Sequence, residues 1–167
     1  MKRNLAIVAT VMLVCTGIWW VKAAENPSSI VGTWRVTSFT YLTLDTNEIS
    51  HPFGENLIGY FQFSPGGHMV LFISAGNPPK PASYPPTDAE RAAILKGMIG
   101  AYAGTYSVEG NKVTYHLVAS WRPEWIGTDL VRYFEIYGNK LTIKSEPMIS
   151  QLTGKRVVNT LTFERVE

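Results

Sequence analysis

The sequence is poor in the residues from which small catalytic and metal centres are built. Its single cysteine is Cys15, so the chain beyond it can have neither an internal disulfide nor thiol chemistry. The three histidines are His51, His68 and His116, and none lies at a metal-ligand spacing from another histidine or from the cysteine. We therefore expect no metal site and no cofactor, although these spacings leave open a haem held by one histidine.

The motifs of common enzyme classes are also missing. The chain has no Gly-x-Ser-x-Gly, no P-loop, no Gly-x-Gly-x-x-Gly and no His-Glu-x-x-His. No two carboxylates are close enough in the sequence to suggest glycosidase chemistry. We therefore predict no catalytic residue from motifs alone.

Positive charge is scarce outside the N-terminus. The formal net charge is +2, but three of the 15 basic residues are Lys2, Arg3 and Lys22, which leaves 12 basic against 13 acidic residues. No basic stripe remains that could attract a nucleic acid, so we expect no nucleic-acid partner.

The longest apolar run lies at the N-terminus. Lys2 and Arg3 precede an uncharged stretch from Leu5 to Val21, and the small residue Ala23 follows. This order is typical of a secretory signal. Residues 1–24 are therefore predicted to be a signal peptide and residues 25–29 a short linker.

A retained membrane anchor is the alternative for the same segment. Its length is at the lower end of what spans a bilayer, roughly 17–25 residues, and Trp19 and Trp20 would suit the membrane interface. In both cases we expect the folded domain, residues 30–167, to be periplasmic or secreted. Any membrane contact would then be made only by an uncleaved N-terminal segment.

The rest of the chain alternates apolar and polar residues between short turns. Proline and glycine in Ser64-Pro65-Gly66-Gly67 supply the backbone angles of a tight hairpin. In the first strand Trp34, Val36 and Ser38 would share one face and Phe39 the other. The predicted strands are residues 31–43, 57–64, 68–74, 103–108, 112–121, 130–137, 140–145 and 156–166. About eight strands at this spacing predict an all-β fold with an antiparallel sheet, either a barrel or a sandwich.

One helix is predicted, at about residues 88–100. It follows a loop with five prolines, residues 78–86, and Thr87-Asp88-Ala89-Glu90 has the pattern of a capping box. We expect the helix to end near Gly100 or Gly104. Its apolar stripe would be Ile94, Leu95, Met98 and Ile99. The loop and helix could form either a mobile lid or a permanent plug.

The two ends of the domain are expected to meet. Trp34, in Gly32-Thr33-Trp34, could fill the closed end of a small barrel. If the first and last strands are neighbours, Arg165 lies over Trp34 as a cation–π pair. On the last strand Arg165 shares a face with Val157, Asn159, Leu161 and Phe163.

Taken in order, these pieces resemble the lipocalin-like domain family of bacteria and fungi over about residues 30–166. The matching segments are Val31-Gly32-Thr33-Trp34-Arg35, Pro52-Phe53-Gly54, Gly59-Tyr60, Ser64-Pro65-Gly66-Gly67, Tyr102-Ala103-Gly104-Thr105-Tyr106, His116-x-x-x-Ser120, Pro123-Glu124-Trp125-Ile126-Gly127-Thr128 and Val131-Arg132-Tyr133-Phe134-Glu135. The resemblance implies a closed antiparallel up-and-down barrel with a cavity for small apolar molecules, and it fixes no reaction. The chain departs from the family at Tyr115, where a histidine is expected, and at Val118, where an acidic residue is common.

Polar or aromatic residues on otherwise apolar strands are the candidates for ligand contact. They are Tyr60, Tyr106, His116, Ser120, Trp125 and Arg132. Arg132 shares a face with apolar residues, so its guanidinium needs a partner, either a ligand carboxylate or an internal ion pair or hydrogen-bond network. Alternation points His116 outward, and only the family resemblance places it in the cavity.

Three functions follow from this reading. The first is an exported protein that binds a small hydrophobic or amphipathic ligand in its barrel. The second is an isomerase, cyclase or hydratase with His116 as acid or base and Arg132 as anion stabiliser, which requires both to face one cavity. The third is a structural envelope domain with a filled barrel.

Overall fold

The computed structural model describes residues 29–167. The predicted signal peptide or anchor and nearly all of the predicted linker lie outside the described residues. Within residues 29–167 no helix has both the length and the apolar character needed to cross a membrane.

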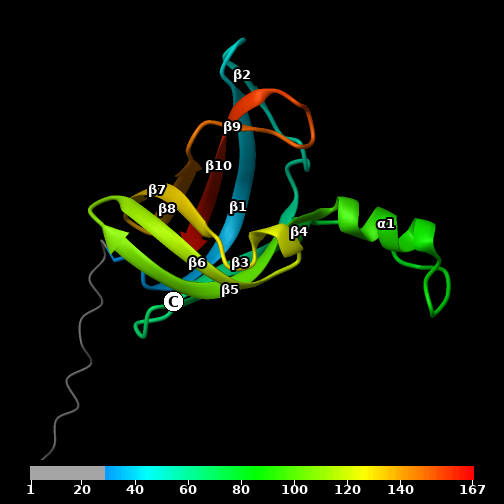
Figure 1. Ribbon diagram of the computed structural model, residues 1–167, viewed down its shortest axis with the longest axis horizontal. Helices are drawn as coiled ribbons and strands as arrows, with labels where there is room; N and C mark the ends of the chain where they lie inside the picture. Colours follow the sequence, from blue (N-terminus) through cyan, green and yellow to red (C-terminus); the bar gives the residue numbers. More distant parts are fainter. Residues whose placement is uncertain (1–28) are drawn as a thin grey trace, which may run out of the picture.

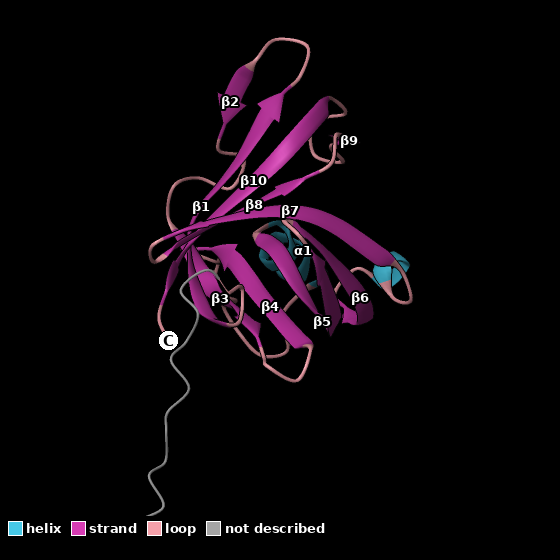
Figure 2. Cartoon of the chain, turned by 90° about the vertical axis from the view of Figure 1, so that its left-hand side faces the viewer, coloured by secondary structure: helices cyan, strands magenta, loops and turns pink. Residues whose placement is uncertain are grey.

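The described chain forms one antiparallel sheet that closes on itself. Its order is β2-β1-β3-β4-β5-β6-β7-β8-β10-β9, and β1 also pairs with β10, so eight strands make a barrel to which β2 and β9 are short additions. Figures 1 and 2 show β1 and β10 side by side along this seam. The strands are β1 Gly32–Thr43, β2 Glu48–Ser50, β3 Leu57–Phe63, β4 His68–Ala75, β5 Met98–Glu109, β6 Lys112–Ser120, β7 Asp129–Tyr137, β8 Lys140–Ser145, β9 Met148–Ile149 and β10 Arg156–Arg165. The predicted closed all-β barrel is confirmed, and a sandwich is excluded.

A bulge in β1 changes which residues of this strand face inward. Val36 pairs with Phe163 and Ser38 with Thr162, so Thr37 is an extra residue without a partner in the ladder. One inserted residue reverses the alternation beyond it. Phe39 is therefore buried with Trp34 and Val36, and the predicted placement of Ser38 on that face and Phe39 on the other is wrong.

The helix begins as predicted but ends earlier. In α1, Asp88–Lys96, the Thr87 side chain accepts from the Glu90 backbone N–H, and the Glu90 carboxylate accepts from the Thr87 N–H. Gly97 caps the helix, and Met98 already pairs with Ser74 of β4. The predicted end near Gly100 or Gly104 is wrong, because pairing with β4 draws these residues into β5 and lengthens that strand at its start.

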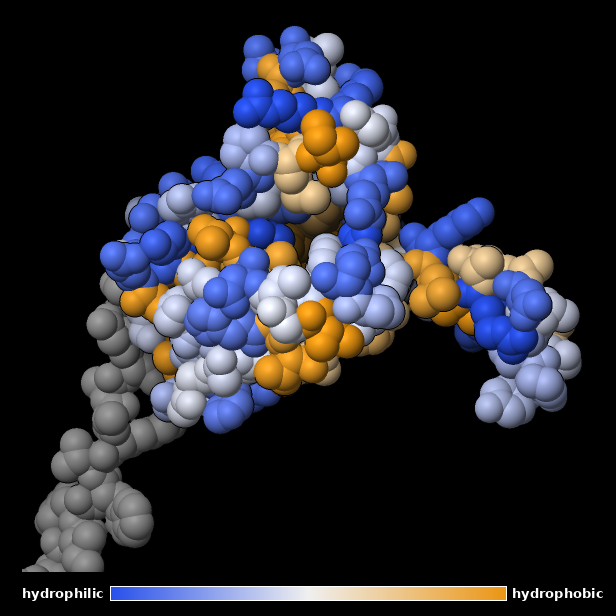
Figure 3. Space-filling model, viewed as in Figure 1, coloured by the Kyte–Doolittle hydropathy of each residue, from blue (hydrophilic) through white to orange (hydrophobic). Residues whose placement is uncertain are grey.

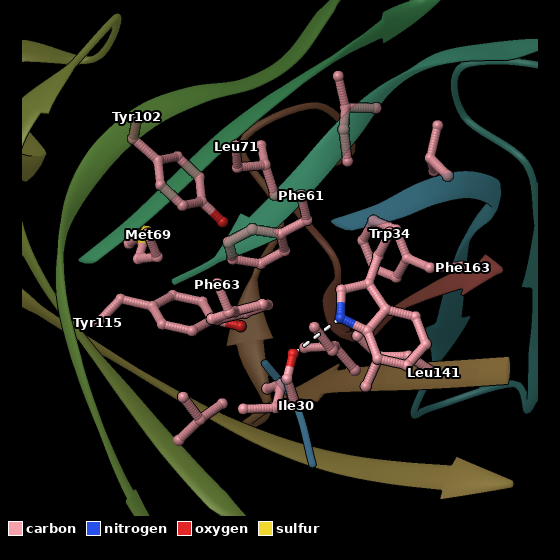
Figure 4. Packing of buried hydrophobic residues seen from close by; sticks show 14 of the residues in the cluster. Ile30, Trp34, Phe61, Phe63, Met69, Leu71, Tyr102, Tyr115, Leu141 and Phe163 are labelled. Atoms are coloured by element: carbon pink, nitrogen blue, oxygen red, sulfur yellow. Dashed lines mark hydrogen bonds between the residues drawn. The ribbon is translucent and has the colours of Figure 1, made fainter. Parts of the chain in front are cut away.

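The core is continuous from one end of the barrel to the other. One cluster surrounds Trp34, Phe61 and Phe163, and Figure 4 shows its aromatic side chains pointing toward one another. A second, smaller cluster consists of Phe39, Tyr41 and Val157. Leu57, Ile99 and Leu161 pack against both clusters.

Trp34 and Arg165 hold one end of the barrel closed. The Arg165 guanidinium carbon lies 4.0 Å from the centroid of the fully buried Trp34 ring, as the sequence predicted. The guanidinium also donates to the carbonyl oxygens of Val31 and Ser29, each at 2.7 Å. The Trp34 indole N–H donates to the Ile30 carbonyl at 2.8 Å, drawn as a dashed line in Figure 4. The segment that precedes β1 is thereby tied to the end of β10.

Replacing Arg165 by methionine is expected to lower the free energy of unfolding by about 2–4 kcal/mol. The change removes a cation–π contact of about 0.5–2 kcal/mol and two charge-assisted hydrogen bonds. Urea denaturation measures the loss. The control is Arg35→Met, which breaks an exposed ion pair with Glu164 in the adjacent pair of the same ladder and should cost less than about 1 kcal/mol. Equal losses for the two variants would contradict the role given to Arg165.

Candidate functional site

The two ends of the barrel differ because their connections differ in length. Tight turns at residues 64–67, 110–111 and 138–139 join the strands at the end closed by Trp34. The connections at the other end are longer and include α1 and the 3-10 helix η1, Pro123–Trp125. The open end is therefore the place where a ligand could enter.

A cavity of about 210 Å³ lies at this open end. Its wall is mainly apolar and comes from the inner faces of β1, β4, β5 and β10; examples are Phe39, Tyr41, Leu71, Ile73, Tyr102 and Leu161. Its rim comes from four separate connections through Phe53, Leu95, Trp125 and Leu152. Figure 3 shows a hollow on this face, with hydrophobic residues beside it. A water occupies about 30 Å³ of liquid, so the lining side chains do not fill this end of the barrel.

Arg132 is brought into this cavity from β7. Its neighbours across the sheet are the buried residues Val113 and Ser145, and it lines the cavity as half-buried. One guanidinium nitrogen donates to the carbonyl of Val131 at 2.7 Å. Among residues 29–167 no carboxylate lies within 4.0 Å of it, so the internal ion pair that the sequence left open does not form.

Two tyrosines stand near Arg132 with neutral hydroxyls. Tyr102 is on β5 and Tyr115 on β6, with ring centroids 6.2 Å apart, and both point into the barrel in Figure 4. Burial raises the pKa of Tyr102 to about 12, opposed by the positive charge of Arg132. Burial also raises the pKa of Tyr115 well above its usual value. Both hydroxyls therefore remain protonated at neutral pH and can donate hydrogen bonds.

The connection from β6 to β7 forms one side of the rim. The Arg122 guanidinium carbon lies 4.6 Å from the Trp125 ring centroid and its Nε donates to Glu124 at 2.9 Å. Trp125 lines the cavity, edge-on to Tyr102 at 6.1 Å. The Ser120 hydroxyl accepts from the Arg122 backbone N–H at 3.1 Å. The structure thus places Trp125 at the cavity, and Ser120 behind the rim rather than on the cavity wall.

The two predicted tyrosines, Tyr60 and Tyr106, lie away from the cavity. Tyr60 is half-exposed on the outer wall, because alternation along β3 turns its neighbour Phe61 inward. Tyr106 packs edge-on against Phe63 near the closed end, and its hydroxyl donates to the Ser64 carbonyl at 2.9 Å. The structure corrects the expectation that these two residues line the cavity. Tyr60 lies on the outer face of the sheet, and Tyr106 lies at the closed end of the barrel.

His116 lies on the outer wall. Alternation predicts this position, whereas the family resemblance places the residue in the cavity. Its Nδ1 is 2.7 Å from the Asp129 carboxylate and its Nε2 is 3.3 Å from the Ser107 hydroxyl. This Ser–His–Asp order is that of a hydrolase triad, but none of the three residues lines the cavity. His116 and Arg132 therefore do not face one common space, which the acid–base hypothesis requires.

Several cavity residues were not among the sequence candidates. Phe39 and Tyr41 were missed because the bulge at Thr37 reverses the alternation of β1. Ile99 was assigned to the helix, although it is the extra residue of a bulge where β5 pairs with β4. Trp121 lines the rim, and its indole N–H is buried and has no hydrogen-bond partner among residues 29–167. Bulges carry little signal in one sequence, so only the pairing registers reveal these positions.

In the described part of the chain, no three His, Cys, Asp or Glu side chains gather in a way that could hold a metal ion. The cavity contributes mainly apolar surface, with arginine, tyrosine and tryptophan donors. This chemistry suits an organic ligand with few polar atoms.

Comparison with known proteins agrees with the fold. A family model for a lipocalin-like domain matches residues 31–166, which is nearly all of the described chain. A search of the curated proteins found no match.

The raised pKa of Tyr102 predicts a loss of stability in alkali. A tyrosine in the unfolded chain loses its proton near pH 10, whereas folded Tyr102 keeps it to about pH 12. The contribution of Tyr102 to the free energy of unfolding is therefore fully present below pH 10. It falls as the pH rises toward 12, by up to roughly 1.4 kcal/mol per pH unit. The free energy of unfolding is measured by urea denaturation at pH 8 and at pH 11. From pH 8 to pH 11 it should fall by about 1 kcal/mol less in Tyr102→Phe than in the wild type.

The matched control for this measurement is Tyr137→Phe, because Tyr137 is 89% exposed. Its alkaline loss should equal that of the wild type. An alkaline loss in Tyr102→Phe as large as in the wild type would contradict the assignment.

Proposed function

The chain belongs to the lipocalin-like domain family, and from this premise we propose that it holds a small hydrophobic or amphipathic molecule in its barrel. The observation that carries the proposal is the open, mainly apolar cavity of about 210 Å³ at the end opposite Trp34. This volume is below the ~300–1,000 Å³ of a common drug-sized site. It therefore favours a compact ligand, such as one short chain or one ring.

The cavity wall favours apolar ligands because it is mainly apolar and its aromatic rings pack against one another. Phe39 contacts Tyr41 and Phe53 edge-to-face, with ring centroids 5.2 and 5.4 Å apart. Fixed aromatic rings lose little conformational entropy on binding. Each Å² of apolar ligand surface removed from water contributes about 25 cal/mol.

Access to the cavity is left open by α1. The helix projects away from the barrel in Figure 1 and has no buried residue. Only its last residues, Leu95 and Lys96, border the cavity. This arrangement does not support a permanent plug, and it places the helix beside the route a ligand would take.

The proposal includes export of the domain. It is supported by the sequence order of Lys2 and Arg3, the apolar run and Ala23, which is typical of a secretory signal. An exported protein of this kind would meet its ligand outside the cytoplasm.

Export predicts that the chain loses residues 1–24 when it is produced with its own N-terminus in a bacterial host. Intact-mass spectrometry of the protein from the periplasmic or secreted fraction should show a chain that begins at Glu25. The full mass in the membrane fraction would instead identify a retained anchor, and the full mass in the cytoplasm would contradict export.

Ligand binding predicts that the purified chain takes up a neutral apolar probe, and that filling the cavity abolishes this. The probe is N-phenyl-1-naphthylamine, whose fluorescence rises in apolar surroundings. Met148 lines the cavity at its rim, so Met148→Trp should weaken probe binding at least tenfold by occupying the space.

The matched control is the next residue, Ile149→Trp. Ile149 is 61% exposed and does not line the cavity, so this variant adds the same side chain on the other face of β9. It should bind the probe as the wild type does. If both variants bind like the wild type, or if the wild type does not bind, the proposed function is wrong.

A further inference from the structure

We propose that the cavity selects ligands bearing one carboxylate and that Arg132 is the residue that binds it. This inference rests on the proposed function, because it names the head group of the ligand held in the same cavity. The ligand class is a compact carboxylic acid with a short apolar chain or a single ring.

The first argument is the unfilled hydrogen-bonding capacity of Arg132. A guanidinium has five N–H donors, and the one bond that Arg132 makes in the structure is to the carbonyl of the adjacent residue, Val131. Its side chain leaves the same face of β7 as Leu130, Phe134 and Ile136, all half-buried against the core. A cation in such surroundings is costly unless an anion joins it. The cavity that Arg132 lines is where such an anion could reach it.

The second argument is the charge of the cavity as a whole. Its charged lining residues are Lys96, Arg122 and Arg132, and no aspartate or glutamate is among them. Arg122 is neutralised by Glu124 at 2.9 Å, and Lys96 sits at the rim, at the end of α1. Arg132 is therefore the cation, within residues 29–167, that lines this cavity from a barrel strand and has no carboxylate partner. The cavity thus favours an anionic ligand over a cationic or zwitterionic one.

The third argument is the neutral hydrogen-bond donors of the cavity wall and of the layer behind it. Within residues 29–167, the Tyr115 hydroxyl and the Trp121 indole N–H are buried and have no hydrogen-bond partner. Trp121 lines the cavity, whereas Tyr115 lies behind its wall. Tyr102 lines the same cavity as Arg132, and its ring centroid is 6.2 Å from that of Tyr115. Buried donors without acceptors are destabilising. A carboxylate in the cavity has two oxygens, which can accept from the Arg132 guanidinium and from the hydroxyl of Tyr102.

The geometry of the head group follows from the geometry of arginine. A planar guanidinium binds the two oxygens of a carboxylate through two parallel hydrogen bonds. A ligand oriented in this way places its apolar part along Phe39, Tyr41 and Leu161, which line the same cavity. A neutral alcohol of the same length contacts the same apolar wall but offers the guanidinium no carboxylate.

The test compares octanoate with octan-1-ol, which share a chain and differ in the head group. Dissociation constants are measured at pH 7.5, where the acid is ionised, by displacement of N-phenyl-1-naphthylamine from the full chain. The wild type should bind octanoate about 10- to 100-fold more tightly than octan-1-ol, the range expected for hydrogen bonds to charged groups. Equal affinities would overturn the inference while leaving the proposed function standing. If neither compound displaces bound probe, the inference fails. If the probe itself does not bind, both fail.

Variants of Arg132 test whether this residue binds the carboxylate. Arg132→Met should weaken octanoate binding by about 10- to 100-fold and change octan-1-ol binding by less than threefold. Arg132→Lys, which keeps the charge but not the planar fork, should retain part of the preference. Arg35→Met on the outer wall is the matched control and should behave as the wild type. An unchanged preference in Arg132→Met would overturn the role of Arg132. If that variant does not fold, an unchanged preference in Arg132→Lys counts against the planar fork, and the wild-type comparison still decides the carboxylate preference.

Discussion

The pairing of β1 with β10 is the contact on which the rest of this structure depends. Without it the ten strands would form an open sheet with no enclosed interior. With it, eight strands enclose a space only wide enough for side chains and one small molecule. Arg165 strengthens the seam where it is needed, because one guanidinium contacts the Trp34 ring and the carbonyls of the segment preceding β1. The contacts that close the barrel therefore also fill its Trp34 end.

The cavity exists because the two ends of the barrel are built from different kinds of connection. Tight turns let aromatic residues such as Phe61 and Phe63 pack fully at the Trp34 end. At the opposite end, long connections place Trp125, Leu152 and Phe53 around an opening instead of across it. Bulges then decide which residues line that opening. The extra residue Thr37 turns Phe39 and Tyr41 inward, and the extra residue Ile99 lies where β5 leaves the rim.

Gly104 shows how a bulge depends on the close approach of two strands. A Cβ at this position would lie 2.0 Å from the His116 carbonyl oxygen, so only glycine permits β5 and β6 to approach this closely. The pairing shifts here, with Ala103 opposite Ala119 and Gly104 opposite Leu117. Beyond the extra residue Val118, Ser120 lies opposite the buried residue Tyr102, whereas His116 lies opposite the exposed residue Thr105. One bulge therefore separates two residues that the sequence pattern had placed on the same face.

The sequence by itself determined the strand alternation, the turn positions, the start of α1, the Trp34–Arg165 contact and the inward direction of Arg132. All but the Trp34–Arg165 contact depend on neighbouring residues or on simple alternation, which a single chain displays directly. That contact follows from the closure of the barrel, which brings the first and last strands together. Only the tertiary structure decided that Phe39, Tyr41 and Ile99 line the cavity and that Tyr60 does not. The outward direction of His116 already followed from alternation. The tertiary structure also decided that α1 ends at Lys96, because Met98 and Gly100 pair with β4. The physical reason is that register and bulges are set by the partner strand, and a residue's own neighbours in the chain do not specify that partner.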